Sequence, residues 1–164
     1  MNANINRSPT SYLLNPKSER EKYEYDVDKD LIQLKFTNLN KEPIGIFNWF
    51  PVHATSMNNT NHLVSSDNVG YASLLLEKWY NTNKLTGKGK FVGAFASANL
   101  GDVSPNIMGA KCEKSGNPCD TLTSTCPKGE GPCFASGPGK DMFESTQIIG
   151  KRLFEAAMVI TFSK

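Results

Sequence analysis

The apolar positions of this chain change their period several times, and each change predicts an element. Ile32, Leu34 and Phe36 alternate with polar residues, which is the two-residue period of a strand. A turn over Asn38–Pro43 and a second apolar run over Ile44–Phe50 follow directly. Two such runs joined by a short turn predict a β-hairpin.

Two later segments have apolar residues near the three- and four-residue spacing of an amphipathic helix. The first covers residues 69–80 and follows Asp67, which is a suitable helix N-cap. The second runs from Asp141 to about Thr161. The apolar positions are Val69, Ala72, Leu76 and Tyr80 in the first segment, and Phe143, Ile149, Leu153, Ala156 and Ile160 in the second.

The remaining segments are one short strand and several loops. Phe91–Ala98 is apolar and contains Gly and Ala, which predicts a buried strand, and the polar loop Asn99–Asn106 follows it. Residues 1–29 and Ile107–Lys140 lack periodicity and are expected to be irregular. The predicted fold class is therefore α/β, with a mixed β-sheet flanked by helices and one long loop.

Composition narrows the class of protein. The 164 residues suit one domain or a piece of a larger one. Lys and Arg number 18 against 16 Asp and Glu, and the basic residues are scattered, so nucleic acid is not an expected partner. No apolar run approaches the ~18 residues of a membrane span, and the first residues lack the apolar core of a signal peptide.

Four cysteines lie in the long loop, at Cys112, Cys119, Cys126 and Cys133. A four-cysteine zinc site usually has tight pairs two to four residues apart, and these are absent. Two disulfides that pin the loop are therefore favoured, and three connectivities are possible. Closing a loop of ~15 residues would contribute roughly 3 kcal/mol in the chain-entropy model.

The cysteines and a glycosylation sequon together indicate an oxidising compartment. Asn58 is followed by Asn59 and Thr60, which makes it a glycosylation acceptor. Clustered cysteines are typical of proteins that pass through the secretory pathway. Because this chain shows no signal peptide, we expect that the true N-terminus lies upstream of Met1.

Both histidines lie in the polar stretch after the second strand. His53 comes just after the strand end, where α/β proteins often place site residues, and it is either a metal ligand or catalytic residue or a hydrogen-bonded structural histidine. His62 lies nine positions further on, which is no helical offset for sharing one metal. We expect His62 to be a structural residue or a supporting neighbour of the site.

Ser104 and Arg7 are the other candidates for chemistry. Ser104 precedes Pro105, which restricts its backbone to extended conformations. It could act as a nucleophile, hold a substrate or simply form a turn, and the G-x-S-x-G pattern of α/β-hydrolases is absent. Arg7 is either an exposed residue or, if it folds back onto the site, a group that stabilises a developing oxyanion.

Several separate motifs, in order, carry a resemblance to one family. They are NINRSPTSYLLNP, FNWFPVHATSMNN, NHLVSSDNVGYASLLLE, FVGAFASANLGDVSPN, the cysteine loop and GPGKDMFESTQIIG. Together they cover almost the whole chain. The sequence resembles the neutral ceramidases, which are zinc-dependent amidases of sphingolipid metabolism.

The resemblance implies a function and a role for individual residues. The reaction is hydrolysis of the N-acyl bond of ceramide to sphingosine and a free fatty acid. His53 would be a zinc ligand, Ser104 the essential serine, and Arg7 a residue near the scissile amide. The resemblance also implies the disulfides Cys112–Cys126 and Cys119–Cys133. It leaves open whether Ser104 or a zinc-bound water attacks the amide.

The resemblance also implies that the site is incomplete. The other zinc ligands of the family, a histidine, a glutamate and a tyrosine, lie upstream and downstream of this segment. We therefore expect residues 1–164 to be the central part of a catalytic domain, with residues 107–140 as its disulfide loop. We expect the chain alone to bind zinc weakly and to hydrolyse nothing, and the remaining segments of the enzyme to be its partners.

Two other hypotheses remain from the sequence. One is a non-catalytic, disulfide-pinned module that binds lipid or another protein, and the other is a serine amidase without a metal. For the enzyme we expect a secreted or cell-surface location and a peripheral contact with the membrane surface that carries its lipid substrate. A reading frame that encodes the missing histidine upstream and the missing glutamate and tyrosine downstream would favour the enzyme over the module.

Overall fold

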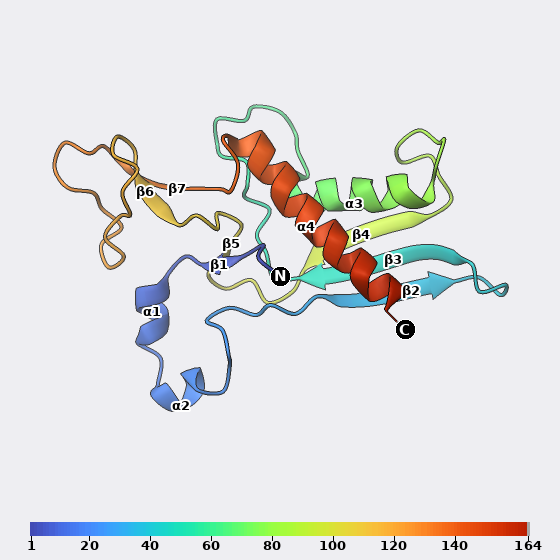
Figure 1. Cartoon of the computed structure of the whole chain (residues 1–164), viewed down its shortest axis with the longest axis horizontal. Coiled ribbons are helices and arrows are strands. Elements are labelled where there is room, and N and C mark those ends of the chain that lie inside the picture. The colour runs from blue at the N-terminus through green and yellow to red at the C-terminus, as the bar shows by residue number, and fades with distance from the viewer. Residues whose placement is uncertain (164) are drawn as a thin grey trace.

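The computed structural model describes residues 1–163 and contains a three-stranded sheet, two long helices and several short elements (Figure 1). The elements are β1 (Ile5–Asn6), α1 (Pro9–Leu13), α2 (Lys17–Arg20), β2 (Ile32–Thr37), β3 (Pro43–Phe50), α3 (Asp67–Tyr80), β4 (Val92–Ser97), β5 (Val103–Ser104), β6 (Ala110–Cys112), β7 (Cys133–Ala135) and α4 (Met142–Phe162).

The central sheet has the strand order β2-β3-β4 and is mixed. β2 and β3 pair in antiparallel fashion, which confirms the predicted hairpin, and β3 and β4 pair in parallel. α3 forms the crossover between the two parallel strands, as such a connection requires. The α/β class with a mixed sheet is therefore confirmed.

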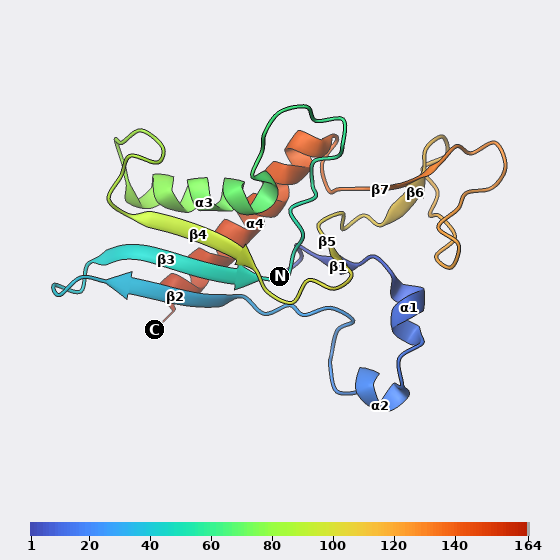
Figure 2. The same cartoon turned by 180° about the vertical axis from the view of Figure 1, so that it is seen from behind.

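Both long helices lie on the same face of the sheet. α4 passes in front of the strands in Figure 1 and behind them in Figure 2, and α3 packs against both α4 and β4. The core between the sheet and the two helices is fully buried, and the sheet, α3 and α4 all contribute residues to it. Its main residues are Ile46, Phe50 and Val52 from β3 and the segment after it, Ala72 and Leu76 from α3, and Ile149 and Leu153 from α4.

The opposite face of the sheet is apolar and open among the described residues. Ile32 and Leu34 lie opposite Trp49 and Phe47, and all four share this face. Gln33 points the other way and donates to the Ala157 carbonyl of α4. The alternation that predicts β2 is thus correct for the strand, but its apolar residues face away from the helices.

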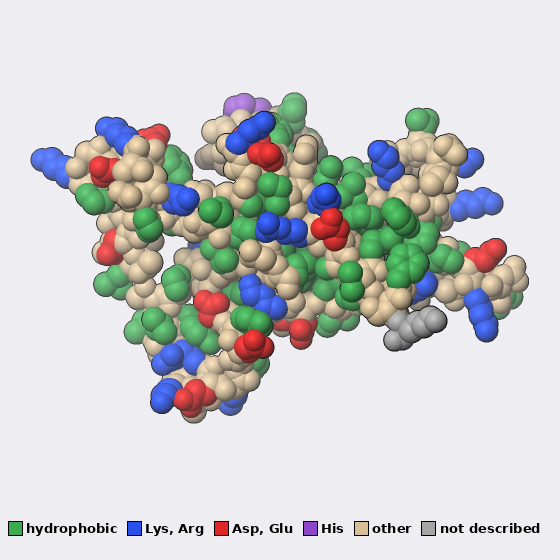
Figure 3. All heavy atoms as spheres, viewed as in Figure 1, with side chains coloured by type: hydrophobic (Ala, Val, Ile, Leu, Met, Phe, Trp, Pro, Cys, Tyr) green, Lys and Arg blue, Asp and Glu red, His purple; other side chains and the backbone are tan. Residues whose placement is uncertain are grey.

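The outer surface of the helices also carries apolar side chains. Hydrophobic groups gather over the C-terminal half of α4 on the face shown in Figure 3. Trp79 of α3 and Val159 and Phe162 of α4 are each more than half exposed. Within residues 1–163, no helix combines the length and the apolar character that crossing a membrane requires.

Two segments that the sequence leaves irregular contain short elements. Residues 1–29 form β1, α1 and α2, and β1 pairs with β5. The long loop over residues 107–140 contains the antiparallel pair β6 and β7. The prediction of plain loop was wrong at these places, because elements of two to five residues are too short to leave a period in the sequence.

We expect Leu76→Ala to lower the free energy of unfolding by about 2–5 kcal/mol, because Leu76 is fully buried beneath β4 and its loss leaves a cavity. Leu74→Ala is the matched control on the same helix, where the side chain is exposed, and should change the free energy by less than about 0.5 kcal/mol. Urea denaturation followed by circular dichroism measures both values. Equal losses in the two variants would contradict this packing of α3 on the sheet.

Candidate active site

The candidate site begins at the carboxyl ends of the parallel strands β3 and β4. Beyond β3, the Val52 amide donates to the Phe50 carbonyl at 3.0 Å, and the Ala98 amide donates to the same oxygen at 3.2 Å. The Ser97 hydroxyl donates to the Val52 carbonyl at 3.1 Å. The chain therefore leaves the sheet along a fixed path, and His53 is the next residue on it.

His53 is half-buried and its ring is held by a backbone group. Nδ1 lies 2.7 Å from the Val103 carbonyl oxygen. A carbonyl only accepts, so Nδ1 carries the proton and Nε2 keeps a lone pair when the ring is neutral. Metal-ligating histidines typically have this arrangement, in which one nitrogen donates to a carbonyl and the other binds the ion.

Ser104 and Arg7 come together through the pairing of β1 with β5. Ile5 lies opposite Ser104 and Asn6 opposite Val103, and the Arg7 amide donates to the Asp102 carbonyl at 2.9 Å. Ser104 is buried. Arg7 and Ser104 are therefore neighbours in space although they are far apart in the sequence.

Both side chains line one cavity of about 320 Å³, and the cysteine loop supplies another part of its wall. The Ser104 hydroxyl accepts a hydrogen bond from the Asn106 amide at 3.2 Å, which leaves its own proton free to be donated. The Arg7 guanidinium lies 4.0 Å from the Asp102 carboxylate and is largely exposed. His53 does not line this cavity, and its ring is bound to the carbonyl of Val103, the residue before Ser104.

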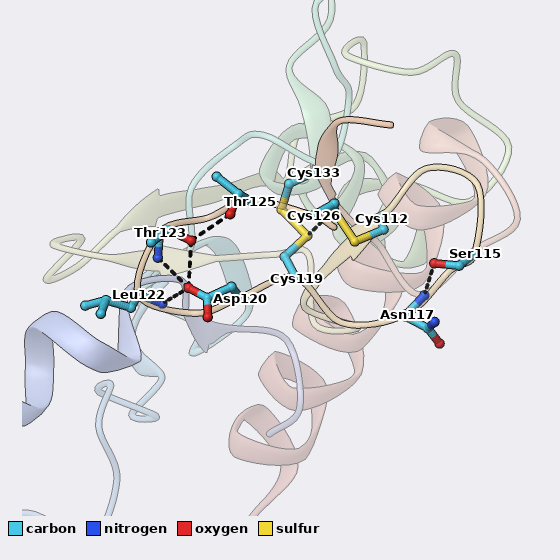
Figure 4. Close-up of a disulfide and its surroundings, with 10 residues drawn as sticks. All are labelled: Cys112, Ser115, Asn117, Cys119, Asp120, Leu122, Thr123, Thr125, Cys126 and Cys133. Carbon is cyan, nitrogen blue, oxygen red and sulfur yellow. Dashed lines mark hydrogen bonds between the residues drawn. A yellow bond between two sulfur atoms is a disulfide. The ribbon is translucent and has the colours of Figure 1, made fainter. Parts of the chain in front are cut away.

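The disulfides hold the loop that forms this wall (Figure 4). Cys112 is bonded to Cys126, and Cys119 to Cys133, which are the two pairs that the family resemblance implies. The Sγ atoms of Cys119 and Cys126 lie 3.6 Å apart, so the two bonds are neighbours. They join β6, β7 and the connection between them into one cross-linked unit.

A tight turn completes the loop beside the second disulfide. The Asp120 carboxylate accepts from the Thr123 hydroxyl and amide, each at 2.7 Å, and from the Leu122 amide at 3.1 Å. These hydrogen bonds, with the Thr123 hydroxyl first, lower the pKa of Asp120. The Thr10 hydroxyl donates to the Thr121 carbonyl at 3.1 Å and so connects α1 with this turn.

The other candidate metal groups do not form a site in residues 1–163. The three sulfur atoms of Cys112, Cys119 and Cys126 are close together, but all are in disulfides and none is a free thiolate. His62 is exposed on the loop between β3 and α3, which does not fit the structural role expected for it. Asn58 is also exposed, on the same loop.

The prediction that Asp67 is a helix N-cap was wrong. α3 begins at Asp67, its N-cap is Ser66, and the Ser66 side chain makes no capping hydrogen bond. The Asp67 carboxylate instead accepts from the Ser56 amide at 3.0 Å and from the Met57 amide at 2.8 Å. These contacts bind the loop that carries His53.

Asn68, which the sequence reasoning missed, contacts the same loop. Its Nδ2 donates to the His53 carbonyl at 3.1 Å and to the Ser56 hydroxyl at 2.9 Å. The only available signal was an acid and an amide side by side where a polar loop meets an amphipathic helix. That pattern also describes an ordinary helix start, so it does not distinguish the two roles.

Comparisons of the sequence with a family model and with individual proteins point to the same family. The family model described as neutral/alkaline non-lysosomal ceramidase, N-terminal, matches residues 1–164. A neutral ceramidase of Drosophila melanogaster is 72% identical over 158 residues, which are 96% of this chain and 22% of that protein. Neutral ceramidase B of Dictyostelium discoideum is 52% identical over 159 residues, again 96% of this chain and 22% of that protein.

A solved structure agrees with the sequence comparisons. A chain described as ceramidase complexed with C2 is 38% identical and superposes with a TM-score of 0.67, covering 96% of this chain and 20% of that one. This chain therefore spans about a fifth of the length of the relatives it matches.

We expect the double variants Cys112→Ala/Cys126→Ala and Cys119→Ala/Cys133→Ala to lose similar stability. Each disulfide has a sequence separation of 14, so each loss corresponds to roughly 3 kcal/mol in the chain-entropy model. Denaturant unfolding under non-reducing conditions measures both.

The control for these variants is Lys128→Ala, at an exposed position of the same loop. It should unfold like the parent protein, because a surface substitution away from the disulfides changes stability little. If either double variant also unfolded like the parent, the disulfide that it removes would not stabilise the loop.

Proposed function

Because the chain belongs to the neutral/alkaline non-lysosomal ceramidase family, we propose that it forms part of a catalytic site that hydrolyses the N-acyl bond of ceramide. The products are sphingosine and a free fatty acid. The observation that carries the proposal is the placement of Arg7 and Ser104 on one cavity, next to the Val103 carbonyl that holds His53.

His53 is the zinc ligand that this chain contributes. The donor set fits, since the hydrogen bond at Nδ1 leaves the Nε2 lone pair for the ion. Zinc, when bound, supplies Lewis-acid polarisation of the amide carbonyl and lowers the pKa of bound water to about 7. A catalytic zinc usually takes three protein ligands, so the others come from parts of the enzyme outside this chain.

Ser104 acts on the substrate inside the cavity. Its oxygen accepts from the Asn106 amide, so its hydroxyl proton is directed elsewhere, towards a carbonyl or hydroxyl of the bound lipid. In this position Ser104 either orients the amide for attack or attacks it directly. Both roles require the buried hydroxyl that β5 provides.

Arg7 stabilises charge at the same cavity. A guanidinium on the wall favours the negative charge that develops on the amide oxygen as the carbonyl is attacked. Asp102 lies 4.0 Å from the Arg7 Nε atom and keeps the guanidinium near the cavity. At this distance the two groups do not form a close ion pair, so the guanidinium donors stay available to the substrate.

The enzyme acts on the secretory route, at a cell surface or after secretion. Two disulfides and an exposed Asn58 sequon support this location. Its substrate is a membrane lipid, so the enzyme meets the membrane surface peripherally.

We expect His53→Ala to lower both zinc content and ceramide hydrolysis of the intact enzyme, because the imidazole that donates to the ion is gone. Zinc is measured by elemental analysis after dialysis, and hydrolysis by release of fatty acid. His62→Ala is the matched control, since His62 is an exposed histidine on the same loop between β3 and α3, and should leave both values unchanged. Full zinc occupancy in His53→Ala would remove the ligand assignment.

Ser104→Ala should separate catalysis from metal binding. We expect kcat to fall by about 10²–10³, the usual loss for a group that stabilises the transition state, while zinc content stays at the parent value. The measurement is steady-state hydrolysis of a short-chain ceramide together with metal analysis. Ser136→Ala, at a hydroxyl outside the cavity lining, is the control, and a kcat equal to that control would exclude Ser104 from the reaction.

A further inference from the structure

The loop that carries His53 lies between β3 and α3, and the first two residues of α3 hold it in place. We propose that Asp67 and Asn68 are positioning residues that fix His53 for metal binding. The inference rests on the role of His53 in the proposed function, and it assigns the start of α3 to the metal site.

Asp67 binds the loop through both carboxylate oxygens. Oδ1 accepts from the amides of Ser56 and Asn68, at 3.0 and 2.7 Å, and Oδ2 accepts from the Met57 amide at 2.8 Å. Asp67 is buried, and the ion pairs formed by residues 1–163 do not include it. The amides of the loop therefore solvate this charge, and the loop cannot move away without stranding a buried carboxylate.

Asn68 binds His53 directly. Its Nδ2 donates to the His53 carbonyl at 3.1 Å and to the Ser56 hydroxyl at 2.9 Å. The carbonyl only accepts, which fixes the orientation of the amide. His53 is thus held at two points, with its backbone oxygen bound by Asn68 and its ring Nδ1 bound by the Val103 carbonyl.

The start of α3 is itself immobilised by α4. A Cβ atom added to Gly150 of α4 would lie 2.7 Å from the Asn68 carbonyl oxygen, so the two helices meet here almost backbone to backbone. Asn68 and Gly150 are both buried, and Asn68 is completely inaccessible to solvent. The clamp on His53 is therefore anchored in the core of the molecule.

Two unfavourable features coincide at these residues. Asp67 has a φ of 53°, in the left-handed region, which is uncommon outside Gly although Asp adopts it more often than most residues. The Asn68 Oδ1 atom is buried and has no hydrogen-bond partner among the described residues. A helix start needs neither feature, and such features persist where the surrounding structure holds a functional group in place.

The test compares two identical substitutions at equally buried asparagines in the intact enzyme. Asn68→Asp replaces the donor to His53 with an acceptor of the same shape. Asn48→Asp makes the same change at a fully buried amide of β3 that donates to the Ala94 carbonyl and does not touch the His53 loop. The readouts are the zinc Kd by chelator competition, well below the melting temperature, and the melting temperature itself.

We expect Asn68→Asp to raise the zinc Kd by about 10–100-fold, the usual effect of losing a residue that supports a metal ligand, and excess zinc to restore hydrolysis. Asn48→Asp should lower the melting temperature while its zinc Kd stays within about twofold of the parent, because a distant structural loss does not reorient His53. Equal zinc Kd values in the two variants would overturn the inference.

Two further variants, Asp67→Asn and His53→Ala, are measured in the same zinc-binding assay. If Asn68→Asp does not fold, Asp67→Asn, which keeps the shape but loses the charge, should raise the zinc Kd by about tenfold, and an unchanged Kd there overturns the inference. If His53→Ala loses zinc while the clamp variants do not, only the positioning inference fails; if it keeps the parent Kd, the ligand assignment fails and the positioning inference with it.

Discussion

The hydrogen bond from the His53 ring to the Val103 carbonyl couples the rigid part of the molecule to the cavity. His53 stands on a path fixed by the ends of β3 and β4, whereas Val103 belongs to β5, which has only two residues. A pair as short as β1 and β5 is marginal by itself, so its position depends on such tethers. This contact is one of the links that place Ser104 relative to the layered core, and Ser104 in turn pairs with Ile5 of β1, the strand just before Arg7.

The cavity wall is built by different means from the core. α1 and α2 bury no residue, so hydrophobic packing does not hold them. Polar and covalent links replace it: the disulfides fix the cysteine loop, and the buried Asn4 donates to the carbonyls of Pro51 and Asp28 at 2.6 and 3.0 Å. Lys29 donates to the Asn4 side chain at 2.7 Å, and burial lowers the pKa of Lys29. The hydrogen bond from Asn4 to Pro51 joins the N-terminal segment to the end of β3, whereas the disulfides cross-link the cysteine loop within itself.

The sequence allowed the hairpin, the strand β4 and both long helices to be predicted, from the period or the apolar character of each segment. The burial expected for β4 was wrong, because the strand lies at the edge of the sheet and only Gly93 of its six residues is buried. It did not reveal which face of β2 the helices cover, since Ile32 and Leu34 alternate in the same way on an open face. Asp67 was misassigned because a cap is a local pattern, whereas its φ and its contacts with Ser56 and Met57 depend on the tertiary fold. The cysteine spacing permitted three pairings, and only the resemblance to a family selected one.

Under the proposed function, the chain supplies a prearranged part of a metal site and leaves the rest of the site to other segments. One imidazole cannot hold a catalytic zinc, which usually takes three protein ligands. This segment can provide the orientation of one ligand. The His53 ring is held at Nδ1 by the Val103 carbonyl and the His53 backbone carbonyl is held by Asn68, so Nε2 is presented in one fixed direction. The entropy of ordering that ligand is then lost during folding rather than during metal binding. A site assembled from distant segments gains most from such preparation, because each ligand that is already oriented reduces what the ion must organise when it binds.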